Sequence, residues 1–209
     1  MSKPSLIPNI WAVGRNYADH AKELGNQVPA VAGEPMIFLK AGSGALGNEA
    51  TFHLPKFTQD IHHEVEIALR FDAQMKFSHV TVSIDLTARE VQNKLKSQGH
   101  PWTLAKSFRE SCLLGPIVPL TPAMHLQNLD FSLKVNGQIR QNGNTKDMIH
   151  NIEKLRQYIV ERFPVVEGDF LLTGTPAGVA ALKTGDLLEA EIKDLKGPGD
   201  SLSASWKVA

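Results

Sequence analysis

The chain has 209 residues, of which 42% are hydrophobic, enough to build one globular domain with a substantial core. Lys and Arg together number 22 and so do Asp and Glu, so the formal net charge is zero. This balance excludes a global electrostatic attraction to nucleic acid or to an anionic membrane. A single cysteine excludes an internal disulfide framework and indicates a reducing compartment.

The N-terminal segment lacks the long apolar core of a secretory signal, and Pro4 and Pro8 interrupt its short apolar run. No apolar stretch approaches the roughly 20 residues that a membrane-spanning helix needs. These features predict a cytoplasmic protein that binds neither nucleic acid nor a membrane.

Gly and Pro divide the chain into short segments, most of which are predicted to be strands. Seven have the length and the β-branched content of strands, namely 10–13, 36–39, 64–71, 131–135, 170–172, 187–192 and 202–208. The pair Asn136–Gly137 follows one of them and is typical of a tight hairpin turn.

Three segments are predicted to be helices: 18–24, 88–97 and about 146–163. The second begins with Thr87 and Glu90 in a capping-box spacing, in which the threonine would cap the helix. Strands do not alternate regularly with helices, which argues against a doubly wound α/β sheet. We therefore expect a mixed α/β, strand-dominated sandwich or roll with few helices.

The segment 61–69 carries two glutamates in an alternating pattern. On a strand, Val65 and Ile67 point to one face, and Glu64 and Glu66 point together to the other. Two neighbouring carboxylates repel each other, and a bound cation would relieve that repulsion. The segment by itself favours the alternative, which is a solvated acidic face on a half-buried strand.

Asp85 ends a second apolar alternation, just before a predicted helix. It is either a third oxygen ligand or a helix-entry residue, and its spacing alone favours the latter. Three carboxylates without a thiolate would favour a hard cation such as Mg²⁺ or Mn²⁺ over zinc. His62 and His63 are strand neighbours that face opposite sides, so they cannot both join the two glutamates.

Gly42–Gly47 matches the spacing GxGxxG after the predicted strand 36–39. No helix is predicted after the loop, so a helix N-terminus that would hold a pyrophosphate is missing. A nucleotide-binding protein built on this loop is therefore the less favoured hypothesis. Lys106 and Thr175 lie in segments that by themselves indicate only a surface lysine and a tight turn.

Seven segments, read together, resemble the fumarylacetoacetate hydrolase family, specifically its small single-domain acylpyruvase or fumarylpyruvate hydrolase-like branch. In family order they are VGRNYADHAKELG (13–25), PMIFLK (35–40), HHEVEIAL (62–69), DLTAREVQ (85–92), GHPWTLAKSF (99–108), VNGQIRQNGNTKDMI (135–149) and GDFLLTGTPAGV (168–179). Together they cover nearly the whole chain. The resemblance implies one catalytic domain over residues 1–209, a β-sandwich or roll, and a homodimer.

The resemblance also implies roles for individual residues. Glu64, Glu66 and Asp85 would bind Mg²⁺ or Mn²⁺. Lys106 matches the family's charge-stabilising lysine that contacts the substrate, and Thr175 matches a residue near the substrate carboxylate.

His20 and Glu23 match the dyad that activates water, on a short lid helix near 17–25. Their spacing of three puts both side chains on one helix face, consistent with a hydrogen-bonded pair. Arg89 and Gln92 are weaker matches, as substrate-binding neighbours of the site.

The implied reaction is metal-dependent hydrolysis of a carbon–carbon bond in an acylpyruvate or a fumarylpyruvate-like 2,4-dioxo acid. Its products are pyruvate and a carboxylic acid, formed through a pyruvate enolate that the cation stabilises. The same site could decarboxylate oxaloacetate or isomerise a dioxo acid, and both stay open as alternatives. The pair of His20 and Glu23 favours hydrolysis, because decarboxylation needs no base to activate water.

Two features depart from the family pattern. Glu90 stands where family members usually have Asp. The link 72–83 between the glutamate strand and Asp85 is shorter than in relatives, which predicts a different site rim or subunit contact.

Overall fold

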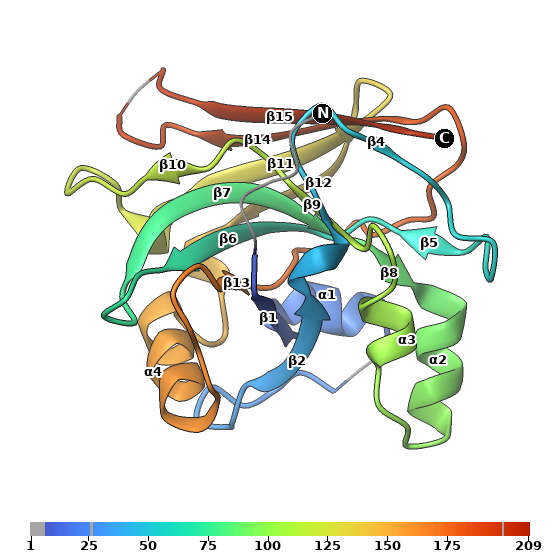
Figure 1. Ribbon diagram of the computed structural model, residues 1–209, viewed down its shortest axis with the longest axis horizontal. Coiled ribbons are helices and arrows are strands. Elements are labelled where there is room, and N and C mark those ends of the chain that lie inside the picture. Colours follow the sequence, from blue (N-terminus) through green and yellow to red (C-terminus); the bar gives the residue numbers. More distant parts are fainter. Residues whose placement is uncertain (1–6, 26, 198) are drawn as a thin grey trace.

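The structure, a computed structural model, describes residues 7–25, 27–197 and 199–209 (Figure 1). The strands are β1 Asn9–Gly14, β2 Met36–Ala41, β3 Ala45–Leu46, β4 Thr51–Phe52, β5 Ile61–His62, β6 Val65–Phe71, β7 Phe77–Asp85, β8 Thr87–Ala88, β9 Cys112–Leu114, β10 Val118–Pro119, β11 Asp130–Val135, β12 Gln138–Asn144, β13 Phe170–Leu172, β14 Leu187–Lys193 and β15 Leu202–Val208. The helices are α1 Ala18–Glu23, α2 Arg89–Ser97, α3 Thr103–Lys106 and α4 Ile152–Arg162, with 3-10 turns η1 Gly42–Gly44, η2 Leu126–Asn128 and η3 Thr145–Asp147.

Two sheets lie face to face, and the helices lie on the far side of the larger one (Figure 1). The 8-stranded sheet has the order β2-β1-β13-β6-β7-β9-β3, with β10 paired to β7. The 5-stranded sheet has the order β12-β11-β14-β15-β4, and β5 and β8 form a separate pair. This strand-dominated α/β architecture with few helices confirms the predicted fold class.

The core between the two sheets explains the direction of the glutamates. Val65 and Ile67 of β6 are fully buried and pack in one cluster with Phe131 and Trp206 of the smaller sheet. Burial of each large apolar side chain contributes roughly 1.5–3 kcal/mol, so this face of β6 is strongly specified. The alternate positions of the strand, including Glu66, must then face the helices.

The hairpin of β6 and β7 places the turn of the short link 72–83 away from the carboxylates. Val65 pairs with Ile84 at one end of the hairpin, next to Glu64 and Asp85. The turn at 72–76 closes the other end, about 20 Å away at ~3.3 Å per residue. The turn 72–76 of the shorter link therefore does not form the rim next to these side chains, and the rest of the link belongs to β7.

The turn between β11 and β12 agrees with its sequence. Asn136 and Gly137 have φ values of 53° and 76°, the left-handed conformation that a tight hairpin turn requires. The predicted hairpin is therefore confirmed.

The third helix is shorter than predicted. α4 begins at Ile152, where the Asn151 side chain accepts a hydrogen bond from the Lys154 N–H at 2.8 Å and caps the helix. Before it, Thr145–Asp147 form the 3-10 turn η3, and the Ile149 N–H donates to the Asn16 carbonyl at 2.8 Å instead of to a helix carbonyl. Tertiary contacts thus override the helical spacing of the apolar residues before Ile152.

The predicted capping box before α2 is also wrong. α2 begins after Ala88, and no side chain caps it. The Thr87 hydroxyl donates instead to the Asp85 carbonyl at 3.3 Å and accepts from Lys106 at 2.6 Å. Thr87 therefore belongs to the neighbourhood of the carboxylates rather than to a helix cap.

The glycine-rich segment Gly42–Gly47 forms the turn η1 and the strand β3, in agreement with the absence of a predicted helix there. A Cβ on Gly42 would lie 1.9 Å from the Ile7 carbonyl oxygen, so a glycine is needed for close packing. This segment offers no pyrophosphate cradle. Among the described residues, no helix combines the length and the apolar character required to cross a bilayer.

Candidate metal centre and active site

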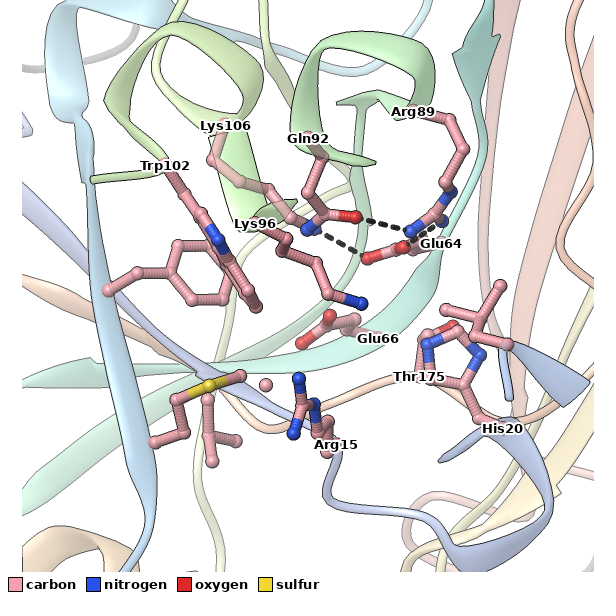
Figure 2. Close-up of a pocket in the computed structure, with 15 residues that line it drawn as sticks. Arg15, His20, Glu64, Glu66, Arg89, Gln92, Lys96, Trp102, Lys106 and Thr175 are labelled. Atoms are coloured by element: carbon pink, nitrogen blue, oxygen red, sulfur yellow. Dashed lines mark hydrogen bonds and ion pairs between the residues drawn. The ribbon is translucent and has the colours of Figure 1, made fainter. Parts of the chain in front are cut away.

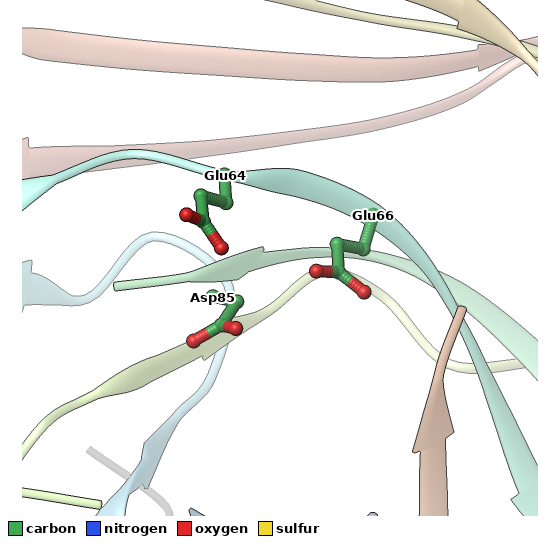
Figure 3. A group of neighbouring side chains, drawn as sticks. All are labelled: Glu64, Glu66 and Asp85. Carbon is green, nitrogen blue, oxygen red and sulfur yellow. The ribbon is translucent and has the colours of Figure 1, made fainter. Parts of the chain in front are cut away.

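Three carboxylates, of Glu64, Glu66 and Asp85, converge where β6 and β7 pair (Figure 3). Each side chain contributes one oxygen, and these oxygens all lie within 4.8 Å of one another. All three residues are buried, with exposed fractions of 4%, 2% and 0% respectively. Glu66 also accepts a hydrogen bond from the Gly174 N–H at 2.6 Å. Buried carboxylates at this spacing require compensating positive charge.

Lys106, at the end of α3, supplies part of that charge. Its ammonium donates to Glu64 Oε2 at 2.7 Å, to Asp85 Oδ2 at 2.6 Å and to Thr87 Oγ1 at 2.6 Å. It also lies 4.9 Å from the centre of the Phe38 ring. Burial lowers the pKa of Lys106, but the charges of Asp85 and Glu64 raise it by more, so the net pKa is raised and the side chain is cationic.

Two further cations, Lys40 and Arg89, contact the carboxylate oxygens of Asp85 and Glu64 that Lys106 does not bind. The Lys40 ammonium lies 2.7 Å from Asp85 Oδ1, with both side chains fully buried. Arg89 forms an ion pair with Glu64 Oε1 and donates to Gln92 Oε1 at 2.7 Å (Figure 2). These contacts fix the rotamers of Glu64 and Asp85.

The pKa values of the two glutamates move in opposite directions. Burial alone raises the pKa of Glu64, but the charges of Lys106 and Arg89 outweigh it and hold the pKa well below the usual range. For Glu66, burial and the charges of Asp85 and Glu64 raise the pKa well above its usual range. The negative charge on Glu66 is therefore the least compensated, and a cation would relieve it. An oxygen-only, buried and net acidic donor set fits a hard divalent cation.

His20 and Glu23 lie on α1 and approach the pocket together. His20 Nδ1 is 3.5 Å from Glu23 Oε2 but has no hydrogen-bond partner among the described residues, so the pair is looser than predicted. Both Glu23 oxygens instead accept from the Gly178 N–H, at 3.0 and 3.2 Å. Burial is the main cause that lowers the pKa of His20, so its imidazole is neutral at pH 7.

A buried asparagine anchors the N-terminal side of α1. Asn16 donates to the carbonyls of His150 at 3.0 Å and Thr173 at 2.8 Å, and accepts from the His150 N–H at 2.7 Å. With the Glu23 contact to Gly178 on the other side, α1 is tied to the chain at both ends. These bonds set the position of His20 against the larger sheet.

Most of the predicted site residues line one pocket (Figure 2). They are His20, Glu64, Glu66, Arg89, Gln92, Lys106 and Thr175. Asp85 belongs to the same carboxylate cluster as Glu64 and Glu66, and Glu23 lies beside His20. The structure therefore brings all nine predicted residues to one region of the molecule.

The sequence analysis missed several residues of this region. Lys40 is a charged residue at the end of an apolar strand pattern, which was its only signal. Gln141 links the Val65 N–H at 3.0 Å to the Thr175 hydroxyl at 2.8 Å, and nothing in its local sequence indicates this role. Arg15 and Lys96 also line the pocket.

Comparisons with known proteins agree with this geometry. The family model described as fumarylacetoacetate hydrolase C-terminal matches residues 9–199. The chain is 38% identical over 210 residues to a mitochondrial oxaloacetate tautomerase of Bos taurus, covering 96% of this chain and 91% of the relative. It is 38% identical over 197 residues to a mitochondrial oxaloacetate decarboxylase of Dictyostelium discoideum, covering 89% of each.

A solved structure with the same fold is fumarylpyruvate hydrolase from Pseudomonas aeruginosa, in complex with Mn²⁺ and pyruvate. It has a TM-score of 0.87 and 27% sequence identity, covering 97% of this chain and 90% of that one. The extent of the family match, the identities and the shared fold all lead to one conclusion. The chain belongs to the fumarylacetoacetate hydrolase family, whose members named above are enzymes.

Proposed function

We propose that the chain is a divalent-metal-dependent enzyme that interconverts the keto and enol forms of oxaloacetate, with His20 as the acid–base group. One observation carries the proposal: the neutral, buried imidazole of His20 lines the same pocket as Glu64 and Glu66. A neutral imidazole beside a cation site is the pair of groups that enolisation requires. The name of the bovine relative supports oxaloacetate as the substrate.

The proton transfer follows from the placement of His20. Its Nδ1 faces Glu23, which leaves Nε2 to remove one proton from C3 of oxaloacetate. The electron pair of that C–H bond forms the C2–C3 double bond, and the carbonyl π pair moves onto the C2 oxygen. Protonation of this oxygen completes the enol, so one proton is lost and one is gained. Mg²⁺ or Mn²⁺ bound by Glu64, Glu66 and Asp85 would stabilise negative charge on that oxygen, which is worth several kcal/mol.

Other pocket residues bind and orient the substrate in this proposal. Arg89 and Gln92, linked at 2.7 Å, and Thr175, held by Gln141 at 2.8 Å, are expected to contact the 2-oxo acid end. Lys106 is expected to stabilise developing negative charge, because its pKa is raised and it stays cationic.

Hydrolysis of an acylpyruvate is the second candidate, favoured by the distance of 3.5 Å between His20 Nδ1 and Glu23 Oε2. The pair would deprotonate a water, which attacks the distal carbonyl. The adjacent carbon–carbon bond then breaks, its electron pair forms the enolate of pyruvate, and the acyl part leaves as a carboxylic acid. The P. aeruginosa hydrolase supports this reading through its fold and its Mn²⁺ and pyruvate.

The decisive experiment adds purified protein, with Mn²⁺ or with EDTA, to enol-oxaloacetate, to keto-oxaloacetate and to acetylpyruvate. Faster decay of the enol absorbance, dependent on metal and without release of pyruvate, supports tautomerisation. Release of acetate and pyruvate from acetylpyruvate supports hydrolysis, and release of pyruvate from oxaloacetate supports decarboxylation.

The His20→Gln variant tests the assigned base in the same assay. We expect it to lower the enzymatic rate about 10²–10⁴-fold, the usual contribution of a general base. A variant that keeps the full rate while binding Mn²⁺ normally would contradict the role of His20.

We also propose an assembly and a location for the protein. The homodimer is a prediction from the family resemblance, and light scattering of the purified chain tests it. The cytoplasmic location also stays a prediction, because the bovine and D. discoideum relatives are named as mitochondrial.

A further inference from the structure

Gln141 of β12 is only 1% exposed, and its side-chain amide is hydrogen-bonded on both sides. Its Oε1 accepts from the Val65 N–H at 3.0 Å and lies 2.9 Å from His63 Nδ1. Its Nε2 donates to the Thr175 hydroxyl at 2.8 Å and to the Pro176 carbonyl at 2.9 Å. The amide therefore joins the start of β6 to the turn that follows β13.

Two backbone groups fix the orientation of this amide. The Val65 N–H can only donate, so it must face Oε1, and the Pro176 carbonyl can only accept, so it must face Nε2. The second hydrogen of Nε2 then points to Thr175 Oγ1. Burial is the main cause that lowers the pKa of His63, so its imidazole is neutral at pH 7 and carries its one proton on Nδ1, facing Oε1.

This orientation decides what the Thr175 hydroxyl can do. Because Oγ1 accepts from Gln141, the hydroxyl hydrogen remains to be donated elsewhere. Within the described residues, it donates to no group of the protein. Thr175 is only 3% exposed and lines the same pocket as Glu64 and Glu66. A buried hydroxyl hydrogen without a protein acceptor, on a residue that lines a pocket, indicates an acceptor on a bound ligand.

A β-bulge lies directly before Gln141. The register shifts where β12 pairs with Leu133 and Lys134 of β11, so Arg140 is an extra residue in β12. Such bulges redirect side chains and are common next to active sites. A Cβ on Gly178 would lie 2.0 Å from the Arg140 carbonyl oxygen, so the bulge packs closely against the turn after β13.

We propose that Gln141 is a positioning residue that fixes the Thr175 hydroxyl as a donor to the carboxylate of a 2-oxo acid bound at the carboxylate cluster. The inference rests on the proposed function, because that function places a 2-oxo acid beside Thr175. It deepens the function, since a hydroxyl held as a donor favours an oxygen acceptor over a group that can only donate. Without the Gln141 amide, the hydroxyl would be free to rotate away from the ligand.

Pyruvate is the probe, because it consists of little more than the 2-oxo acid group. Its dissociation constant is measured by calorimetry with protein saturated with Mn²⁺. Gln141→Met keeps the size of the side chain and removes its hydrogen bonds. We expect this variant to bind pyruvate about tenfold more weakly, as the loss of one hydrogen bond to a charged group would give. Gln138→Met changes an exposed glutamine of the same strand and should bind pyruvate as wild type does.

A double-mutant cycle shows whether Gln141 acts through Thr175. Thr175→Val removes the hydroxyl and should also weaken pyruvate binding about tenfold, whereas Thr175→Ser keeps it and should lose less. Adding Gln141→Met to Thr175→Val should weaken binding by at most about twofold more, because the hydroxyl that Gln141 positions is already gone. A purely structural role of Gln141 would instead give additive losses, about a hundredfold in the double variant.

A second variant and a spectroscopic measurement support the cycle. If Gln141→Met fails to fold by circular dichroism, Gln141→Glu takes its place in the same cycle. Its carboxylate keeps an acceptor for the Val65 N–H but has no hydrogen to donate, so the Thr175 hydroxyl would donate to it instead of to pyruvate. In wild type, the ¹⁵N NMR spectrum of the imidazole should show the proton of His63 on Nδ1.

Unchanged pyruvate binding in the Gln141 variant, additive losses in the cycle, a wild type that does not bind pyruvate, or a His63 proton on Nε2 would overturn the inference. The proposed function fails separately, if wild type shows no metal-dependent turnover of oxaloacetate or acetylpyruvate. Non-additive losses in a protein without turnover would keep the role of Gln141 and refute the reaction. Additive losses in an active protein would do the reverse.

Discussion

Lys40 and Asp85 form an ion pair in which both side chains are fully buried, with Lys40 Nζ 2.7 Å from Asp85 Oδ1. The same ammonium donates to the carbonyl of Leu86 at 3.3 Å and to the carbonyl of Lys106. One lysine from β2 therefore joins the end of β7 to the end of α3. The contact orients a member of the carboxylate cluster from a strand 45 residues away in the sequence.

Replacement of Lys40 by Met should strongly destabilise the metal-free protein, because Asp85 would keep a buried charge with one cation fewer. Removal of one partner from a buried pair costs roughly 3–5 kcal/mol in the free energy of unfolding. Urea denaturation measures the loss. Lys134→Met, on an exposed position of β11, should change the same free energy by only about 0.5 kcal/mol. Equal stability of Lys40→Met and wild type would refute this account of the pair.

Glu66→Gln should separate metal binding from folding. Because burial and the charges of Asp85 and Glu64 disfavour the charged form of Glu66, the neutral amide should leave the metal-free protein at least as stable as wild type. The dissociation constant for Mn²⁺, measured by calorimetry, should increase roughly 10–100-fold or more. Glu189→Gln, an exposed position on β14, is the matched control and should bind Mn²⁺ as wild type does. Unimpaired Mn²⁺ binding by Glu66→Gln would exclude Glu66 as a ligand.

The decrease in activity at acidic pH, which is the acid limb of the pH–rate profile, should reflect the protonation of the His20 imidazole. A base must be neutral to accept a proton, so kcat/KM should fall as the pH drops through the pKa of His20. Burial lowers that pKa, so the limb should lie below 6.5, the usual value for histidine. Activity should therefore be pH-independent on the neutral side of that value. A limb above 6.5, or the same limb in the residual activity of His20→Gln, would contradict the assignment.

Glu23 should act mainly by holding α1 in place. Its carboxylate accepts from the Gly178 N–H at 3.0 and 3.2 Å, so Glu23→Ala removes the acceptor and Glu23→Gln keeps one. We expect Glu23→Ala to speed hydrogen exchange of the amides in 18–23 and to raise KM, and Glu23→Gln to lie closer to wild type. Lys22→Ala, an exposed neighbour, serves as the control. Unchanged exchange in Glu23→Ala would show that this contact does not hold the helix.

Cys112 should be unreactive in the folded protein. Burial raises the pKa of its thiol to about 12 from an ordinary value of 9, so the nucleophilic thiolate is scarce at pH 8. Iodoacetamide should modify it only after unfolding. Since the folded pKa is raised, its stabilising contribution is complete below pH 9 and is lost as the pH rises toward 12. Rapid alkylation of the native protein at pH 8 would contradict this burial.

Within single strands and tight turns, the local sequence predicts which way side chains point and how the backbone bends. The alternation around Val65 and Ile67 predicted correctly that Glu64 and Glu66 share the opposite face. The turn at Asn136–Gly137 was predicted for a similar reason, since its two residue types favour a positive φ. In both cases a few adjacent residues are sufficient for the prediction. The backbone geometry of a strand decides which face each side chain points to, and the residue types of a tight turn decide its backbone conformation.

The errors and omissions arise where distant segments meet. Thr87 was expected to cap α2 but lies 2.6 Å from the Lys106 ammonium, and the helix before Ile152 is replaced by backbone that pairs with Asn16. Local propensity could not predict either contact, because both depend on a partner segment that is distant in the sequence. Once that segment is in place, the tertiary contact stabilises the chain more than a helix cap or one helical turn would.

The sequence by itself thus determined the strand-dominated class, the direction of the two glutamates and the candidate site residues. Only the tertiary structure decided that Asp85 joins them, that Lys40 pairs with Asp85 and Lys106 with Asp85 and Glu64, and that Arg15 faces the same pocket. The physical reason is that strand alternation is a property of one segment with a period of two residues. A buried charge cluster depends on the pairing of β6 with β7 and the packing of β2 and α3 against them, which bring together residues far apart in the chain.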